Sequence, residues 1–267
     1  MNDLAFANED VLENHTDWYV RTFSDDYLFL YAHRSEEEAE AHVQAAVEHV
    51  PFRAGQHVLD IACGAGRHLL AFSKRGACVT GIDLSKVLLE NARLRFAQRK
   101  FKAEFVQKDM RRIPFVAQFD GVTMWFTSFG YFEKSAEDRF VLAGLSRALK
   151  SHGWWWIDLP NPNYIKDTLV PFSKRKIDGP HGLALVHERR KMVGNRVVKT
   201  ISVEDDLGKR TYIEKVRLYT PERFAAMIFD AGLSADGILG DYSGASFKRQ
   251  SPRQIWFGRK KEPDVSI

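Results

Sequence analysis

One glycine-rich turn constrains this chain more than any other feature of its sequence. It lies in the run Val58-Leu59-Asp60-Ile61-Ala62-Cys63-Gly64-Ala65-Gly66, where a short apolar segment ends in a carboxylate. Such a segment predicts a buried parallel strand, and the glycines allow a tight turn whose backbone can approach a ligand closely. From Arg67 to Lys74 the apolar residues recur at helical spacing. A strand, a glycine turn and a helix in this order form the nucleotide-binding corner of an open α/β sheet.

The residues around the turn argue against two common nucleotide motifs. A dinucleotide fingerprint would place a third glycine where Leu69 stands, and the chain has no Gly-Lys-Ser or Gly-Lys-Thr of a phosphate-binding loop. Asp60 stands four residues before Gly64 instead, and its charge would repel a pyrophosphate but attract a cation. S-adenosylmethionine carries a sulfonium and an ammonium group. The run from Asp60 to Gly66 resembles the first motif of class I S-adenosylmethionine-dependent methyltransferases; a turn used only for packing is the alternative.

Two further acids stand at the ends of predicted strands. The second strand is predicted over Cys78–Asp83, and Asp83, 23 residues after Asp60, is placed to accept hydrogen bonds from both hydroxyls of a ribose. The third strand is predicted over Phe105–Gln107. The resemblance implies that Asp109 then accepts a hydrogen bond from the adenine amino group, with the backbone of Met110 beside it; a turn cap is the other interpretation of Asp109.

Composition narrows the class of protein. The 267 residues, 45% of them hydrophobic, suffice for one large domain with a sizeable core. No segment approaches the roughly 18 consecutive apolar residues of a transmembrane helix, and the N-terminus lacks the features of a signal peptide. With two cysteines and a net charge of +4, the sequence predicts a cytoplasmic protein without a disulfide framework and disfavours nucleic acid as a partner.

The segment before the glycine turn predicts a helical cap. Residues 1–34 are aromatic and acidic, and the resemblance implies that they close over the cofactor, which makes Tyr19, Tyr27 and Tyr31 lid candidates; simple packing is the alternative. Residues 35–50 predict a helix that begins with Ser35 as N-cap and ends before Pro51.

Aromatic residues also follow the fourth predicted strand, Phe119–Trp125. The loop Phe126-Thr127-Ser128-Phe129-Gly130-Tyr131-Phe132 lies where the transferable methyl group would point, and its rings suit a pocket that excludes water. This loop resembles that of bacterial small-molecule methyltransferases close to the amino-sugar N-methyltransferases. Ser128 lacks the G-x-S-x-G context of a hydrolase nucleophile.

The alternation of strands and helices breaks after the fifth predicted strand, Trp154–Leu159. Residues 163–182 are expected to form a loop, and residues 183–219 a β-meander that covers the cofactor as a substrate lid. A helix is predicted from Thr220 and a hairpin over 238–242 and 254–257.

We therefore predict a Rossmann-like seven-stranded class I methyltransferase sheet with helices on both faces. The predicted divisions are a cap over 1–50, a cofactor-binding domain over 51–162 and 220–262, and the insertion over 163–219. The residues that the resemblance implies for the cofactor are Tyr27, Asp60, Ala62, Cys63, Gly64, Gly66, Asp83, Leu84, Asp109, Met110, Trp125 and Phe126. The predicted substrate pocket comprises Tyr19, Tyr31, Thr127, Ser128, Phe129, Tyr131, Arg217 and Arg253.

The expected activity is methyl transfer from S-adenosylmethionine, leaving S-adenosylhomocysteine, to a nitrogen or oxygen of a small molecule, without a metal. An amine that reacts neutral needs no base, whereas a hydroxyl does; Tyr131, His181 and His187 are the candidates. An RNA or protein methyltransferase is disfavoured, because no Asn-Pro-Pro-Tyr-like loop follows the fourth strand. A non-catalytic binding protein stays open, and the expected assembly is a monomer or homodimer.

Overall fold

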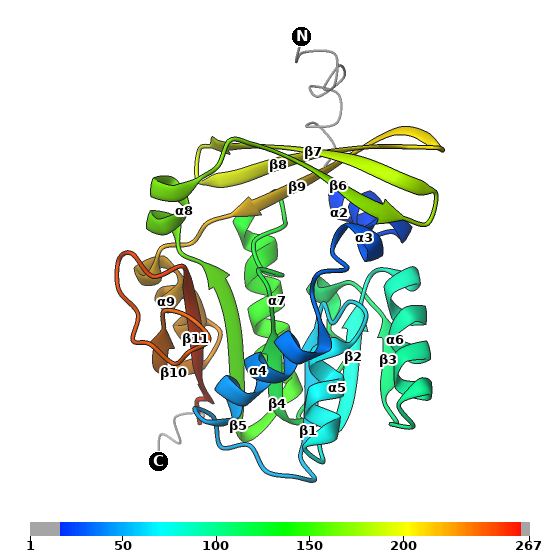
Figure 1. The fold of residues 1–267 in the computed structure, drawn as a ribbon. Helices are drawn as coiled ribbons and strands as arrows, with labels where there is room; N and C mark the ends of the chain where they lie inside the picture. Colours follow the sequence, from blue (N-terminus) through cyan, green and yellow to red (C-terminus); the bar gives the residue numbers. More distant parts are fainter. Residues whose placement is uncertain (1–16, 263–267) are drawn as a thin grey trace.

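A seven-stranded mixed sheet forms the centre of the molecule, and a four-stranded antiparallel sheet lies across one end of it (Figure 1). The structure is a computed structural model that describes residues 17–262. The strand order of the large sheet is β10-β11-β5-β4-β1-β2-β3. Its strands are β1 (His57–Ile61), β2 (Cys78–Asp83), β3 (Glu104–Gln107), β4 (Phe119–Met124), β5 (Leu149–Pro160), β10 (Leu233–Leu239) and β11 (Arg253–Lys260). The five strands from β3 to β5 are parallel, and β11 runs antiparallel to both of its neighbours.

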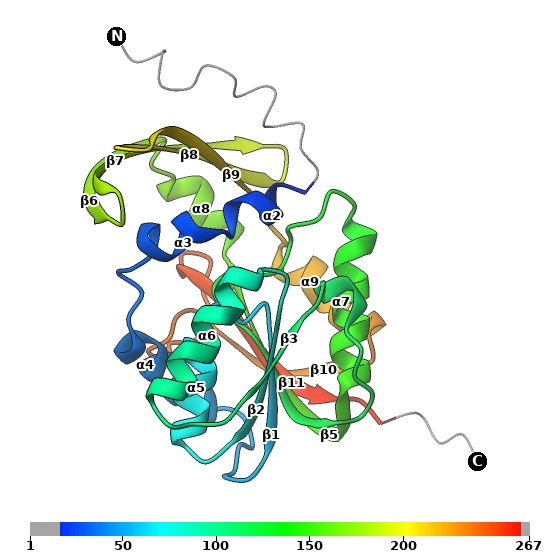
Figure 2. The same ribbon diagram turned by 90° about the vertical axis from the view of Figure 1, so that its right-hand side faces the viewer.

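Helices cover both faces of this sheet. The helices are α2 (Trp18–Thr22), α3 (Asp25–Leu30), α4 (Glu36–Val47), α5 (Arg67–Lys74), α6 (Lys86–Gln98), α7 (Ser135–Ala148), α8 (Pro162–Thr168) and α9 (Pro221–Asp230), with a 3₁₀ turn, η2, at Met110–Arg112. Figure 2 shows α4, α5 and α6 on one face and α7 and α9 on the other. The Rossmann-like sheet with helices on both faces is confirmed.

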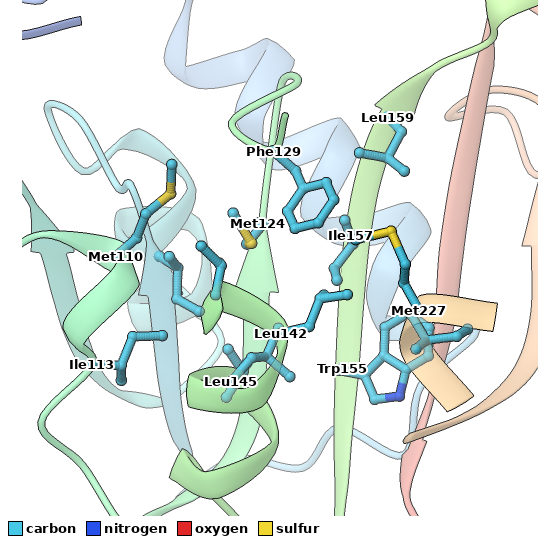
Figure 3. Close-up of a cluster of buried hydrophobic side chains, with 14 of the residues drawn as sticks. Met110, Ile113, Met124, Phe129, Leu142, Leu145, Trp155, Ile157, Leu159 and Met227 are labelled. Carbon is cyan, nitrogen blue, oxygen red and sulfur yellow. The ribbon is translucent and has the colours of Figure 1, made fainter. Parts of the chain in front are cut away.

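The core lies on both sides of the parallel strands, which explains their nearly continuous apolar sequences. In β1, Val58, Leu59 and Ile61 are fully buried. On the α7 side, Leu142 and Leu145 pack with Trp155 and Ile157 of β5 (Figure 3). Because the central strands β1 and β4 are covered on both faces, the side chains at their carboxyl ends are held in a packed environment.

Polar side chains cap the starts of α4, α6 and α9, and Ser35 is the N-cap that the sequence predicts. The hydroxyl of Ser35 accepts a hydrogen bond from the amide of Glu38, that of Ser85 from Leu88, and that of Thr220 from Arg223. Each side chain satisfies one of the amides that a helix leaves without an internal partner. These caps fix where α4, α6 and α9 start.

The segment after β5 differs from the prediction. Residues 163–182, expected as a loop, contain α8 and a further strand, β6 (Phe172–Gly179). The inserted sheet therefore has the order β6-β7-β8-β9, with β7 (Gly182–Val193), β8 (Arg196–Asp205) and β9 (Gly208–Arg217). Strand β6 is an edge strand rich in charged residues, in which Ile177 alone joins the apolar cluster beneath the sheet, so its sequence carries little strand periodicity.

The cap helices and the inserted sheet pack together, although they lie far apart in the sequence. Leu30 of α3 is buried against Ala184 and Val186 of β7. Asp26 of α3 accepts hydrogen bonds at 2.7 Å from Arg210 and from the hydroxyl of Tyr212, both on β9. Residues 1–16 of the predicted cap lie outside the described part of the chain. Within residues 17–262, no helix combines the length and apolar character needed to cross a bilayer.

Candidate active site

A cavity of about 680 Å³ lies between the carboxyl edge of the parallel strands and the cap helices α2 and α3. Its floor comes from the loops after β1, β2, β3 and β4, and its wall from the cap. The volume lies within the range of sites that bury small ligands. The cavity occupies the position at which open α/β sheets bind their ligands.

Asp83 and the glycine turn form one unit on the floor. One carboxylate oxygen accepts a hydrogen bond from the amide of Gly64 at 2.8 Å, and the other accepts one from the amide of Ser85 at 2.8 Å. Burial raises the pKa of Asp83, although these amides oppose the rise. Gly64 has a φ of +54°, a conformation that glycine adopts readily. The turn and the acid thus present a preformed surface to the cavity.

Asp60 lies beside this unit at the end of β1. It is 2% exposed, and its carboxyl accepts a hydrogen bond from the hydroxyl of Thr123 at 2.8 Å. Burial raises the pKa of Asp60 well above its usual range. A carboxyl group whose charged form is disfavoured by burial gains most from a cation placed next to it. This position fits the ammonium or sulfonium group of the expected cofactor.

Asp109 begins the 3₁₀ turn at the end of β3. Its carboxylate accepts a hydrogen bond from the amide of Arg111 at 2.8 Å and forms an ion pair with the guanidinium of the same residue. Burial opposes the charged form, but the contacts with Arg111 hold the pKa of Asp109 below its usual value. Asp109 is thus a turn cap, the second of the two interpretations, and it also lines the cavity with Met110.

Three tyrosines form much of one side of the cavity: Tyr27 and Tyr31 of the cap, and Tyr131 of the loop after β4. The rings of Tyr27 and Tyr31 lie 4.7 Å apart, and Phe23 bridges Tyr27 and Tyr131 at 5.1 and 5.6 Å. Burial raises the pKa of all three hydroxyl groups, so each stays neutral at pH 7. Tyr31 donates a hydrogen bond to Glu214 at 2.5 Å. The rings of this part of the wall are therefore aromatic, and their hydroxyl groups are neutral.

Three arginines that were not predicted as site residues also line the cavity: Arg34, Arg67 and Arg95. Arg34 donates a hydrogen bond to the hydroxyl of Tyr27 at 2.7 Å and lies 4.2 Å from the ring centre of Tyr31. Arg67 lies 4.5 Å from the ring of Phe126 and pairs with Glu38 at 2.5 Å. Arg67 directly follows Gly66, so its position next to the glycine turn could have been predicted from the sequence. Arg34 lies at the cavity because of the way the cap folds over the sheet, and no local sequence pattern predicts that position.

Most residues predicted for the cofactor border this cavity. Those that do are Tyr27, Asp60, Ala62, Cys63, Gly64, Asp83, Leu84, Asp109, Met110, Trp125 and Phe126. Gly66 does not: a side chain there would point toward Ala92 and Phe96 of α6. Gly66 has a φ of +72° and stands immediately before α5, so it shapes the turn from behind.

The predicted substrate pocket is divided by the structure. Tyr19, Tyr31, Ser128 and Tyr131 border the cavity, whereas Thr127, Phe129, Arg217 and Arg253 do not. Phe129 is 1% exposed and lies in the core with Met124 and Ile157 (Figure 3). Arg217 donates to the carbonyls of Phe132 and Glu133. These four residues therefore lie outside the cavity, and their contact with a substrate stays a prediction.

The two histidines predicted as bases also lie elsewhere. His181 is exposed in the turn between β6 and β7. His187 lies on β7 between the buried residues Val186 and Glu188, and its ring contacts Phe172 on β6. Since successive strand residues point to opposite faces, His187 faces away from the cap helix under the sheet. Neither histidine borders the cavity, and the role of either as a base stays a prediction.

His68 was not predicted, yet it borders the cavity. Its ring stacks on Trp125 with centres 4.5 Å apart, and its Nε2 lies 3.4 Å from Nδ1 of His42. Burial lowers the pKa of His68 well below its usual value, so the ring is neutral. No cluster of three or more potential metal ligands occurs among the described residues.

Comparison with known proteins agrees with this geometry. A family model described as a methyltransferase domain matches residues 58–153, which run from β1 into β5. The cypemycin N-terminal methyltransferase of Streptomyces sp is 26% identical over 75% of this chain and 82% of that protein. The dTDP-3-amino-3,4,6-trideoxy-alpha-D-glucopyranose N,N-dimethyltransferase of Streptomyces venezuelae is 28% identical over 70% of this chain and 79% of that protein.

Solved structures share the fold. An S-adenosylmethionine-dependent methyltransferase from Clostridium acetobutylicum ATCC 824 superposes with a TM-score of 0.74 at 17% identity, covering 88% of this chain and 96% of that one. At this level of identity the likeness concerns the fold. The residues matched by the family model include the glycine turn and all three acids described above.

Proposed function

We propose that this chain, an S-adenosylmethionine-dependent methyltransferase, transfers the methyl group of its cofactor to a nitrogen atom of a small molecule. The observation that carries the proposal is the arrangement of the cavity, with carboxylates on its floor and neutral aromatic rings on its wall. Of the relatives named above, one is named as the N,N-dimethyltransferase of a dTDP-amino sugar and the other as an N-terminal methyltransferase.

The floor would hold the cofactor. When bound, S-adenosylmethionine supplies a methyl group made electrophilic by the sulfonium charge. We assign the ribose hydroxyls to Asp83, because its oxygens retain lone pairs beyond those used by Gly64 and Ser85. We assign the positive charge to the side of Asp60. Asp109 and Met110, one strand further along the same edge, would border the adenine.

The wall would hold the acceptor and keep water away. Tyr27, Tyr31 and Tyr131 have raised pKa values and therefore offer neutral hydroxyl groups rather than a phenolate base. An amine needs only to arrive unprotonated and to be aligned with the methyl group, which orientation by a rigid pocket achieves. An acceptor hydroxyl would need a base that these tyrosines do not supply at neutral pH. The wall thus favours nitrogen over oxygen.

The same proposal includes the setting of the enzyme. Cys63 and Cys78 carry free thiols, which a reducing cytoplasm maintains. We place the protein there as a monomer or homodimer that acts on a small molecule rather than on nucleic acid. The division into cap, cofactor-binding domain and insertion also stays a prediction.

Two measurements test the function. Titration calorimetry with S-adenosylhomocysteine should give saturable 1:1 binding, and the Asp83→Ala variant serves as a control with a damaged site. Radiolabelled S-adenosylmethionine is then incubated with a bacterial metabolite extract and with a panel of dTDP-amino sugars. Label in a small amine product supports the proposal. Binding without transfer to any acceptor would indicate a non-catalytic binding protein, and label in RNA or protein would overturn the choice of substrate class.

A further inference from the structure

Two consecutive residues after β4 have a backbone conformation that L-amino acids rarely adopt. Phe126 has a φ of +51° and Thr127 a φ of +66°, and neither is a glycine. Left-handed conformations are unfavourable for residues with a Cβ, most of all for a β-branched residue such as threonine. Such a pair persists only where the surrounding structure holds it. It stands between Trp125 and Ser128, which both border the cavity.

Asp158 contacts both residues of this pair. Its side chain is fully buried on β5, next to the end of β4. One carboxylate oxygen accepts a hydrogen bond from the amide of Phe126 at 3.0 Å, and the backbone carbonyl of Asp158 accepts one from the amide of Thr127 at 3.2 Å. One residue thus binds two successive amides of the turn.

The remaining contacts of Asp158 complete the support. Its second carboxylate oxygen pairs with Nε of Arg253 at 2.7 Å, and the same guanidinium donates to the hydroxyl of Thr127 at 2.8 Å. The hydroxyl of Tyr242 donates to the first oxygen at 2.7 Å. Both oxygens of the carboxylate therefore accept hydrogen bonds. The donors are the amide of Phe126 in the turn, the guanidinium of Arg253, which also binds Thr127, and the hydroxyl of Tyr242.

We propose that Asp158 is a positioning residue, which holds the Phe126–Thr127 turn in its left-handed form so that this loop fits the bound cofactor. The inference rests on the function proposed above. Asp158 does not border the cavity itself and acts through Phe126, whose ring lies against the guanidinium groups of Arg67 and Arg34. Thr127 and Arg253, predicted as substrate contacts, belong to this support instead.

The test uses S-adenosylhomocysteine as the probe and needs no acceptor. Asparagine at position 158 can accept through only one oxygen, so Asp158→Asn must lose either the amide of Phe126 or Arg253. We expect its dissociation constant to rise by about tenfold or more. The second substitution Thr127→Gly, made in the Asp158→Asn background, should restore affinity to within about threefold of wild type, because glycine adopts the left-handed form without help.

A matched control separates positioning from general stability. Asp120 also accepts a hydrogen bond from a backbone amide, that of His57, and pairs with Lys150, but it lies at the start of β4, away from the cavity. Asp120→Asn should lower the melting temperature and leave the affinity for S-adenosylhomocysteine unchanged. If Asp158→Asn also lowers the melting temperature but leaves the affinity for S-adenosylhomocysteine unchanged, the proposal is overturned.

Three further outcomes are decisive. Failure of Thr127→Gly to restore binding would mean that the loss comes from the unpaired charge of Arg253, which contradicts the proposed role. If Asp158→Asn does not fold, Thr127→Pro tests the same point, because proline fixes φ near −65°; normal binding by that variant would refute the need for the turn. Absence of binding by the wild-type protein would instead refute the proposed function.

Discussion

The carboxylate of Asp83 and the backbone amide of Gly64 are joined by a hydrogen bond of 2.8 Å. This bond links the end of β2 to the turn that follows β1, so an acid on one strand sets the shape of the loop on the next. The same carboxylate also binds the amide of Ser85 and thereby the start of α6. The part of the cavity that we assign to the ribose is consequently held in place by two backbone amides.

The first prediction concerns this acid. Asp83→Ala should raise the dissociation constant for S-adenosylhomocysteine by well over tenfold, because the diol loses its acceptor and the amide of Gly64 is left without one. Calorimetry measures the change. Asp83→Asn keeps one acceptor oxygen and should be affected less. Unchanged affinity of the alanine variant would remove Asp83 from the ribose site.

Gly66 allows a prediction on stability. Gly66→Ala should lower the free energy of unfolding by about 2–4 kcal/mol, because φ is +72° and the new Cβ would lie 3.1 Å from that of Ala92. The control is Gly55→Ala, which has a φ of +87° and open space around it, and it should cost only about 1–2 kcal/mol. Urea denaturation compares the two. Equal losses would show that packing against α6 contributes nothing.

The hydroxyl of Tyr31 connects the cap to the inserted sheet. It donates to Glu214 on β9 and accepts a hydrogen bond from Lys199 on β8 at 2.7 Å. Tyr31→Phe leaves these buried polar groups with one partner fewer, so we expect a loss of about 1–3 kcal/mol in the free energy of unfolding. Tyr164→Phe, whose hydroxyl makes no hydrogen bond to a described residue, should have no effect. A neutral Tyr31→Phe would show that water replaces the lost contacts.

The base candidates can be separated by methyl transfer. His187→Ala should transfer label from S-adenosylmethionine as well as wild type does, because His187 lies outside the cavity. Tyr131→Phe should lower the rate by about tenfold, since one hydrogen bond to an aligned acceptor is lost. The assay is the one with the metabolite extract. A large loss with His187→Ala would show that the inserted sheet reaches the acceptor by a route absent from this structure.

A final prediction concerns pH. Burial lowers the pKa of His42 to about 4, against about 6.5 in an unfolded chain. The unfolded state therefore binds the proton first, and stability falls as the pH drops from about 6.5 toward 4. His42→Phe, which can keep the stack on Tyr242, should make the fall in melting temperature over this interval shallower. Parallel curves for the two proteins would mean that other groups control acid unfolding.

The sequence was sufficient where each element carries its own signal. The predicted and observed bounds of β2 coincide at Cys78–Asp83, since an apolar run ending in an acid has one interpretation. The three acids could be assigned to one edge because parallel strands end together. The strand β6 was missed because an edge strand needs few apolar side chains, and its charged residues conceal the alternation.

The face of the sheet to which a strand residue points could not be predicted in the same way. His187 stands next to Val186, which does face the core beneath the sheet, and a shift of one residue would have reversed the two. The roles of Thr127 and Arg253 depend on a contact between residues 126 positions apart. No periodicity predicts that two polar side chains will satisfy each other rather than a ligand.

The contacts between α3 and the inserted sheet restrict how the cavity can admit a ligand. Asp26 is held by Arg210 and Tyr212, and the carbonyl of Leu30 accepts a hydrogen bond from Arg175. Neither layer can swing aside without breaking these bonds. The two helices and the inserted sheet are therefore coupled, so that a displacement of one layer that keeps these bonds carries the other layer with it.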